Sequence, residues 1–321
     1  MLIPKSNYKA PIHLFNGHLE TIVPSIFRKI DGVDYMRERV NTPDGDFLDL
    51  DWLTNDYDKL VILSHGLEGS SERHYIKGMA KYFHQRHWDI LAWNCRSCSG
   101  EMNLRPRFYH HGATNDLQTV IEHGLSTNAY NTVVLIGMSM GGSLTLKYLG
   151  EQCEKLPDAV KGAVTFSVPC SLKASVRSLE KRSNKFYKKR FLKKLEKKIA
   201  LKARMFPDKI RYQGFQNIKS FSDFDNQYTA PLHGFTDAED FYRKASAVRY
   251  LTEINVPTLI VNALNDPMLE RDCYPVEAAK DHSFVHLEMP EKGGHVGFSL
   301  LGSEFNWAEK RAFQFIDQYI E

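Results

Sequence analysis

A strand, a sharp turn and a helix are predicted between Thr132 and Leu149, and this stretch constrains the fold more than any other. Thr132 to Ile136 is a short apolar run of the kind found in buried parallel strands. The turn Gly137-Met138-Ser139-Met140-Gly141 follows directly, and a helix follows the turn. In a G-x-S-x-G turn the serine takes a strained backbone conformation that exposes its hydroxyl group, and the glycines let strand and helix approach closely. Because the helix N-terminus faces Ser139, its N–H groups point at any negative charge that develops there, which suits acyl transfer.

The segments around this turn predict a larger sheet of the same kind. Strand-like runs alternate with helical patterns, which is typical of an α/β protein whose parallel sheet is covered by helices on both faces. Met36 to Leu53 alternates around Pro43-Asp44-Gly45 and predicts a hairpin at the sheet edge. The further strands are expected at Lys59–Ser64, Asp89–Asn94, Val160–Val168, Pro257–Ala263 and Phe284–Glu288, and the helices at His74–His87, Asp116–His123 and Glu304–Ile320.

Two later residues are the predicted partners of Ser139. Asp266 follows the strand at 257–263, and His295 lies in a glycine-rich loop after the last strand. Serine, then aspartate, then histidine in these positions is the chain order of one triad architecture. Asp266 could instead only cap the turn at Pro267. Of the other histidines, His18 in the helix-like stretch 15–22 is expected to be structural rather than catalytic.

The loop after the strand at 59–64 is the predicted source of an oxyanion donor. It reads His65-Gly66-Leu67-Glu68-Gly69-Ser70, and a His-Gly pair there lets the backbone approach the substrate. The backbone N–H groups of Leu67 and Met140 are therefore predicted to bind the oxyanion. The alternative is a glycine-rich connector with an ordinary histidine.

The region from Ser171 to Tyr250 shows no convincing strand and is basic at its start. Between Lys173 and Arg204 there are fourteen Lys or Arg and two Glu, an excess of twelve positive charges in a chain whose net charge is +3. Leu192, Leu195, Ile199 and Phe206 can share one helical face. We predict a helical cap at 169–250 inserted into a core formed by 1–168 and 251–321, with the polar loop 96–116 also shaping the site. Such a cap could dock on anionic lipid, or it could be a solvated cover that packs on the core.

Composition excludes several classes of protein. With 321 residues, 42% hydrophobic and 25% charged, the chain is expected to be a globular cytoplasmic protein without a membrane span or signal peptide. Five cysteines argue against a disulfide framework, and Cys95 and Cys98 are expected to be reduced thiols rather than metal or redox groups. No metal and no cofactor are required. Few aromatic residues interrupt the basic run, so nucleic acid is not an expected partner.

These motifs together resemble the α/β-hydrolase superfamily, and within it the YheT-like branch, which is similar to eukaryotic α/β-hydrolase-domain phospholipases. The resemblance covers nearly the whole chain. It implies a mostly parallel sheet of eight strands, a Ser139, Asp266, His295 triad and hydrolysis of carboxylic esters. The run of three glycines that lipases carry in the oxyanion loop is interrupted by Leu67-Glu68. The signature stretches are 15–19, 65–70, 137–141, Pro231-Leu232-His233-Gly234-Phe235, Asn265-Asp266-Pro267 and Gly293-Gly294-His295.

The sequence thus predicts a serine hydrolase that cleaves a small-molecule or lipid ester through an acyl-serine intermediate. Two alternatives stay open. One is an acyltransferase of the same fold, in which an alcohol or thiol replaces water. The other is a non-enzymatic protein that binds anionic surfaces and carries a vestigial triad. Acyl length, leaving group and oligomeric state are not determined by these patterns.

Overall fold

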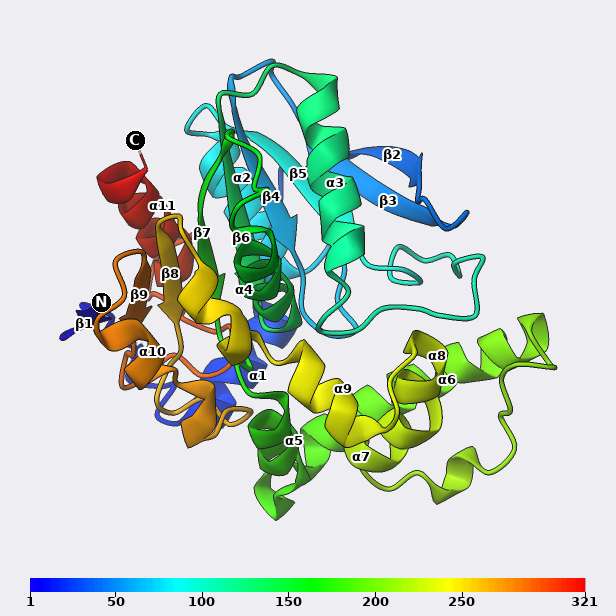
Figure 1. Ribbon diagram of the computed structural model, residues 1–321. Coiled ribbons are helices and arrows are strands. Elements are labelled where there is room, and N and C mark those ends of the chain that lie inside the picture. Colours follow the sequence, from blue (N-terminus) through cyan, green and yellow to red (C-terminus); the bar gives the residue numbers. More distant parts are fainter. Residues whose placement is uncertain (321) are drawn as a thin grey trace.

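A mixed sheet of nine strands forms the centre of the computed structural model, which describes residues 1–320 (Figure 1). The strand order is β1-β9-β8-β7-β6-β4-β5-β3-β2. Only the β2–β3 and β3–β5 pairs are antiparallel, so the predicted hairpin at the sheet edge is confirmed. The strands are β1 (Leu2–Ile3), β2 (Met36–Asn41), β3 (Phe47–Leu53), β4 (Lys59–Ser64), β5 (Asp89–Asn94), β6 (Thr132–Met138), β7 (Val160–Phe166), β8 (Thr258–Val261) and β9 (Val285–Glu288).

The ninth strand corrects the expected count of eight. β1 has two residues, which pair in parallel with Leu287 and Glu288 of β9. A strand of two residues is too short to show an alternating pattern, which explains why the sequence did not indicate it. The mostly parallel sheet covered by helices is otherwise as predicted.

Helices cover both faces of the sheet, because its central strands carry apolar side chains on both sides. In β4, Leu60 and Ile62 join the core on one face, while Val61 and Leu63 join the core on the other. The first face carries α3 (Thr114–Thr127), α4 (Met140–Gln152) and α10 (Val276–Lys280); the second carries α2 (His74–His84) and α11 (Trp307–Tyr319). Helix α2 ends three residues earlier than predicted, since His87 has a left-handed backbone with φ of 63°.

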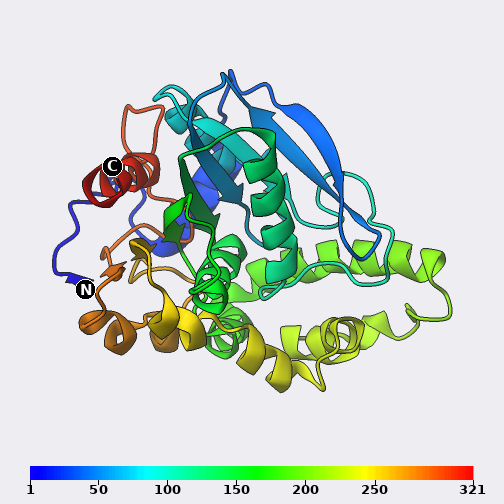
Figure 2. The same ribbon diagram turned by 45° about the horizontal axis from the view of Figure 1, so that its top comes forward.

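Residues 169–250, between β7 and β8, form helices and turns without a strand. The helices between residues 172 and 245 lie together on one side of the molecule, below the sheet in Figures 1 and 2, whereas the last short helix packs against α4. The helices of the whole segment are α5 (Leu172–Glu180), α6 (Lys185–Met205), α7 (Phe221–Phe224), α8 (Ala230–His233) and α9 (Ala238–Ala245), with the short helices Arg182–Asn184, Phe215–Asn217, Asp225–Thr229 and Ala247–Glu253.

The long basic helix α6 packs its apolar side against the rest of the protein. Leu195 and Ile199 are buried, and Leu192 and Phe206 are partly buried against the same core. Among the described residues, no helix is long and apolar enough to cross a membrane. These four apolar residues are therefore used for internal packing, as expected for a cover that packs on the core.

Candidate active site

Ser139 lies between β6 and α4 in a conformation that few non-glycine residues adopt. Its φ and ψ are 55° and −118°, a strained combination typical of a nucleophile turn. The glycines on either side are required by close contacts. A Cβ atom at Gly137 would lie 2.5 Å from the carbonyl oxygen of Gly141, and one at Gly141 would lie 2.1 Å from the carbonyl oxygen of Ser64. Only glycine allows this approach, which holds the serine above the end of the sheet.

The structure brings the three predicted triad residues together in one chain of hydrogen bonds. His295 Nε2 is 2.9 Å from Ser139 Oγ, and His295 Nδ1 is 2.8 Å from Asp266 Oδ2. The side chain of Asp266 is fully buried and that of His295 is 11% exposed. Asp266 also accepts a hydrogen bond at Oδ1 from the N–H of Met268, at 2.8 Å. It therefore caps its own turn and contacts the imidazole at the same time, so the two interpretations of this aspartate are compatible.

Helix α1 (Gly17–Phe27) ties the aspartate loop to the histidine loop. The buried carboxylate of Glu20 accepts two hydrogen bonds at Oε2, from Asn265 Nδ2 at 2.9 Å and from the N–H of Gly293 at 2.6 Å. The next residue of the helix, Thr21, accepts a hydrogen bond at Oγ1 from the N–H of His295, at 2.8 Å. The sequence did not indicate these roles for Glu20 and Thr21. The signal in the sequence that could have indicated these roles was the presence of polar residues in an otherwise apolar helical stretch.

His18, another polar residue of that helix, turns toward α6. Its Nδ1 lies 3.1 Å from the hydroxyl oxygen of Tyr187, and the two rings are stacked with their centroids 5.7 Å apart. His18 therefore joins the core to the inserted helices, in line with the expected structural role.

The predicted oxyanion loop is fixed from both sides by buried groups. His65 is fully buried, which lowers its pKa to about 4, so the ring is neutral near pH 7. Its Nδ1–H donates to the carbonyl oxygen of Gly66, and its Nε2 accepts from the N–H of Cys95. In the described part of the chain, no acceptor is paired with the N–H of Leu67 or Met140. The loop lies beside Ser139, since a Cβ at Gly66 would lie 3.1 Å from the Ser139 Cβ.

An apolar cavity, partly open to solvent, begins at Ser139 and His295. Its walls come mainly from the inserted helices. Most of the lining side chains are aliphatic or aromatic, among them Leu172, Val176, Leu179, Phe191, Leu195, Phe221, Phe224 and Phe241. The loop after β5 supplies another wall through Phe108, Tyr109, His110 and His111. Such a lining suits a hydrocarbon chain.

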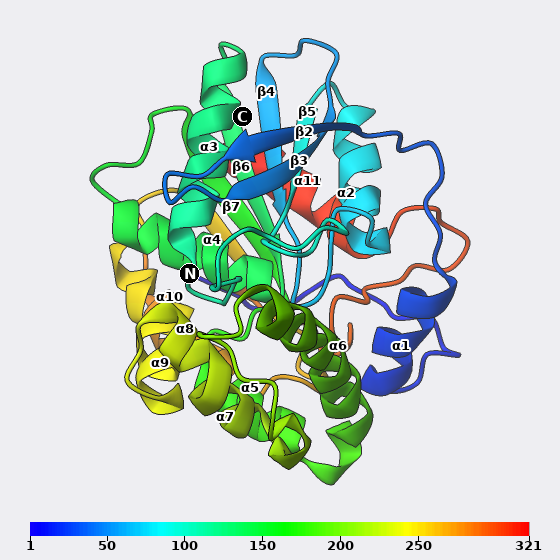
Figure 3. The same ribbon diagram turned by 90° about the vertical axis from the view of Figure 1, so that its right-hand side faces the viewer.

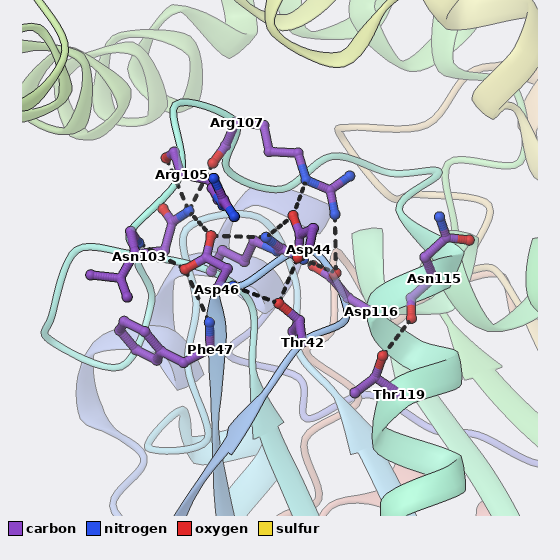
Figure 4. Close-up of polar contacts among 12 residues, drawn as sticks. Thr42, Asp44, Asp46, Phe47, Asn103, Arg105, Arg107, Asn115, Asp116 and Thr119 are labelled. Atoms are coloured by element: carbon purple, nitrogen blue, oxygen red, sulfur yellow. Dashed lines mark hydrogen bonds and ion pairs between the residues drawn. The ribbon is translucent and has the colours of Figure 1, made fainter.

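A buried charge cluster holds the loop that carries this second wall. The side chain of Arg96 is 1% exposed and forms ion pairs with Asp44, Asp46 and Asp116, at 2.9, 2.8 and 2.7 Å. Figure 4 shows these carboxylates converging, with Asn103 and Arg107 beside them. The amide of Asn103 donates to the carbonyl oxygen of Arg107 at 2.8 Å. The sequence suggested only a polar loop here, because the pairing of residues so far apart in the chain depends on the tertiary fold.

One buried carboxyl group lies in the apolar wall of the cavity. Asp225 accepts hydrogen bonds from the hydroxyl groups of Thr229 and Tyr242, at 2.6 and 2.8 Å. Burial raises its pKa to about 6, because the charged form is poorly solvated there. These hydrogen bonds satisfy a polar group that the cavity itself does not solvate.

The cysteines form no disulfide within the described residues. All five cysteines are free, and Cys98 Sγ lies 3.2 Å from Lys198 Nζ. Over residues 1–320, no group of three or more His, Cys, Asp or Glu side chains is arranged to hold a metal ion.

Comparison with known proteins places the chain in a family. A family model described as the alpha/beta hydrolase fold matches residues 59–300. The candidate esterase YheT of Escherichia coli (strain K12) is 32% identical over 315 residues, which cover 95% of this chain and 92% of YheT. Phospholipase ABHD3 of Homo sapiens is 29% identical over 326 residues, which cover 98% of this chain and 79% of the relative.

A solved structure agrees on the fold. Esterase Pf2001 of Pyrococcus furiosus superimposes with a TM-score of 0.61 at 16% identity, covering 90% of this chain and 92% of the esterase. The chain therefore belongs to the α/β-hydrolase fold family, in the YheT-like branch that has esterases and phospholipases among its relatives.

Proposed function

We propose that this protein is a serine hydrolase that cleaves carboxylic esters through an acyl-serine intermediate. The observation that carries the proposal is the unbroken series of hydrogen bonds from Asp266 through His295 to Ser139 at the mouth of an apolar cavity. The esterase and phospholipase relatives support the same reaction class.

Each residue has a role that follows from its contacts. Ser139 Oγ attacks the ester carbonyl carbon while His295 Nε2 takes the hydroxyl proton. Asp266 accepts from His295 Nδ1–H, which leaves Nε2 free to take that proton. The N–H groups of Leu67 and Met140 bind the oxyanion, and each such donor is worth about 3 to 4 kcal/mol of transition-state stabilisation.

The first tetrahedral intermediate then collapses to the acyl-serine, and a second one forms and collapses during its hydrolysis. The carbon–oxygen bond to the alcohol breaks, and His295 gives its proton to the departing alkoxide. Water next attacks the acyl-serine while His295 takes one of its protons, which returns to Ser139 Oγ as the carboxylic acid leaves. We place the acyl chain in the apolar cavity, under residues 169–250 acting as a cap of the core.

The two alternatives to a hydrolase, a vestigial triad and an acyltransferase, are distinguished in different ways. The ordered hydrogen-bond series argues against a vestigial triad, since nothing else in the fold requires the Ser139–His295 contact. An acyltransferase would use the same residues and pass the acyl group to an alcohol or thiol. With short alcohols present at graded concentrations, a hydrolase forms mainly free acid, whereas an acyltransferase forms mainly the new ester.

The direct test of the nucleophile is covalent labelling. A fluorophosphonate probe should modify the protein once, at Ser139, because only an activated serine attacks such electrophiles at a useful rate. Ser126→Ala, which removes an exposed serine near the end of α3, serves as the control and should label normally. Ester hydrolysis measured over graded acyl lengths should vanish in Ser139→Ala, with a loss of about a million-fold. Labelling that persists in Ser139→Ala would refute the assignment.

We also propose that α6 contacts anionic membranes from the cytoplasmic side. Four exposed lysines, at 185, 189, 193 and 197, recur every four residues on the outer side of the helix. Since its main apolar side chains face inward, this contact relies on charge, at about 1 kcal/mol per lysine near an anionic surface. Sedimentation with anionic vesicles at low salt, lost on changing the four lysines to Gln, is the expected result. Equal sedimentation of both proteins would leave α6 with packing roles alone.

A further inference from the structure

A second cavity opens on the other side of Ser139. It lies between α1, the start of α2 and the first half of α6, three elements that can be followed in Figure 3. It shares Leu67, Ser139 and His295 with the apolar cavity. An ester bound at Ser139 therefore has a separate space for each of its two halves. This inference rests on the proposed function, because it concerns the half of the ester that remains when the acyl half occupies the apolar cavity.

The second cavity differs from the first in its charge. Arg73, Arg190 and Lys194 line it, and it has no Asp or Glu in its lining. Arg73 Nη2 and Lys194 Nζ each donate to the carbonyl oxygen of Glu68 at 2.9 Å. Because both nitrogens are 2.9 Å from one oxygen, they are at most 5.8 Å apart. Two positive charges this close repel each other unless an anion lies between them.

The nearest carboxylates do not neutralise these charges. Glu68 pairs with Lys198 at 2.8 Å and accepts from the Tyr109 hydroxyl, while Glu72 pairs with Lys77 at 2.7 Å. In the described part of the chain, Arg73, Arg190 and Lys194 form no ion pair with an acidic side chain. The three cations of the cavity thus lack an ion-pair partner among the described residues, and Glu68, which is already paired with Lys198, compensates Lys194 only in part.

His74 lines the same cavity and carries a buried polar atom, Nδ1, without a hydrogen-bond partner in the described residues. Burial, followed by the charges of Arg28 and Arg73, lowers its pKa to about 3. Burial, followed by the charge of Arg73, likewise lowers the pKa of Lys194. Both shifts have the sign expected in a positive potential.

We propose that the second cavity binds an anionic group, phosphate or carboxylate, on the alcohol half of the ester. Arginine and lysine are the side chains that bind such groups through charge-assisted hydrogen bonds. The absence of a lining carboxylate makes a net negative group a better fit than a zwitterion, whose cationic part the three side chains would repel. Arg190 is exposed, so it meets the anion at the mouth of the cavity.

The test compares soluble hexanoyl esters of glycerol, glycerol 3-phosphate, glycerophosphocholine and glycolate. The ratio of kcat/KM for each anionic ester to that for the neutral glycerol ester should exceed one, and the phosphocholine ester should fall below the phosphate ester. Arg73→Gln and Arg190→Gln should each lower the anionic-to-neutral ratio about tenfold, the size of a lost hydrogen bond between charged groups. Arg204→Gln, which removes an exposed arginine near the end of α6, should leave the ratio unchanged.

Binding without turnover supplies a second readout. In Ser139→Ala, inorganic phosphate and glycolate should bind by calorimetry, more weakly as salt rises, and Arg190→Gln should weaken both. Preference for phosphate over glycolate would identify a phosphate group as the occupant. Equal turnover of neutral and anionic esters, with no phosphate or glycolate binding, would overturn the anion site and leave the ester hydrolase intact. Failure to hydrolyse any ester would instead reject the proposed function.

Discussion

Replacement of Glu20 tests whether α1 positions the reacting groups. Its Oε2 is the acceptor for both Asn265 Nδ2 and the N–H of Gly293, and Glu20 is 1% exposed. Asn265 precedes Asp266, and Gly293 lies two residues before His295, so one oxygen atom fixes the loops of both partners of Ser139. Its other oxygen, Oε1, is buried and has no partner among residues 1–320.

The geometry gives the size of the effect. Glu20→Ala leaves two buried donors without an acceptor, at about 1 to 3 kcal/mol each, so the free energy of unfolding should fall by about 2 to 6 kcal/mol. A displacement of the catalytic groups by 1 Å can cost about 100-fold in rate. We therefore expect kcat to fall about 10- to 100-fold, with little change in KM. Glu20→Gln should keep most of the rate, since its carbonyl oxygen can replace Oε2 and its amide can occupy the position of the unpaired Oε1.

The assay is steady-state hydrolysis of a short neutral ester, combined with urea denaturation of each variant. Glu291→Ala is the matched control, because Glu291 is exposed in the same loop as His295. Wild-type kcat and stability in Glu20→Ala would refute the positioning argument. An equal loss in Glu20→Gln and Glu20→Ala would show that the negative charge matters rather than the accepted hydrogen bonds.

Three further substitutions have outcomes fixed by the contacts. Asp266→Asn should fold normally, since its amide oxygen can still accept from Met268, but kcat should drop about ten-thousand-fold as the imidazole tautomer is lost. Arg96→Met should lower the free energy of unfolding by about 3 to 5 kcal/mol in urea titrations, because buried carboxylates lose their cation. His65 has a folded-state pKa of about 4 against an unfolded value of 6.5. The unfolded state therefore binds the proton first, so stability should be lost as the pH falls from 6.5 through 4, by about 3 kcal/mol. His65→Gln should reduce the difference between urea titrations at pH 7.5 and pH 4.5, and an unchanged difference would contradict this.

The site residues that sequence could predict are those whose position follows from the sheet alone. Ser139, Asp266 and His295 each follow a strand of the parallel region, and the carboxyl ends of parallel strands meet at one edge. Their convergence needs only the strand assignments. Glu20 and Arg73 were not predicted, because their importance depends on how helices pack. A Cβ at Gly17 would lie 1.9 Å from the carbonyl oxygen of Asn265, a contact that no local pattern encodes.

The basic run, Lys173 to Arg204, is the segment for which the structure adds most to the interpretation of the sequence. As a sequence it is one block of positive charge, and its apolar residues could face either lipid or protein. In the structure the helical period places seven of the eight lysines of α6 in two sets, and the eighth, Lys188, pairs with Glu180. Lys194 and Lys202 turn inward, where Lys194 contacts the carbonyl oxygen of Glu68 at 2.9 Å and Lys202 that of Asn103 at 3.0 Å.

Lys198, between these two, pairs with the Glu68 carboxylate at 2.8 Å. This inward set, spaced by four residues, holds the oxyanion loop and the loop after β5 against α6. The outward set, also spaced by four, is left to solvent or an anionic surface. The excess of positive charge therefore has two separate causes. A variant that neutralises only the outward lysines can change surface binding without loosening the cover of the proposed acyl cavity, whereas loss of the inward lysines disturbs the loop next to Leu67.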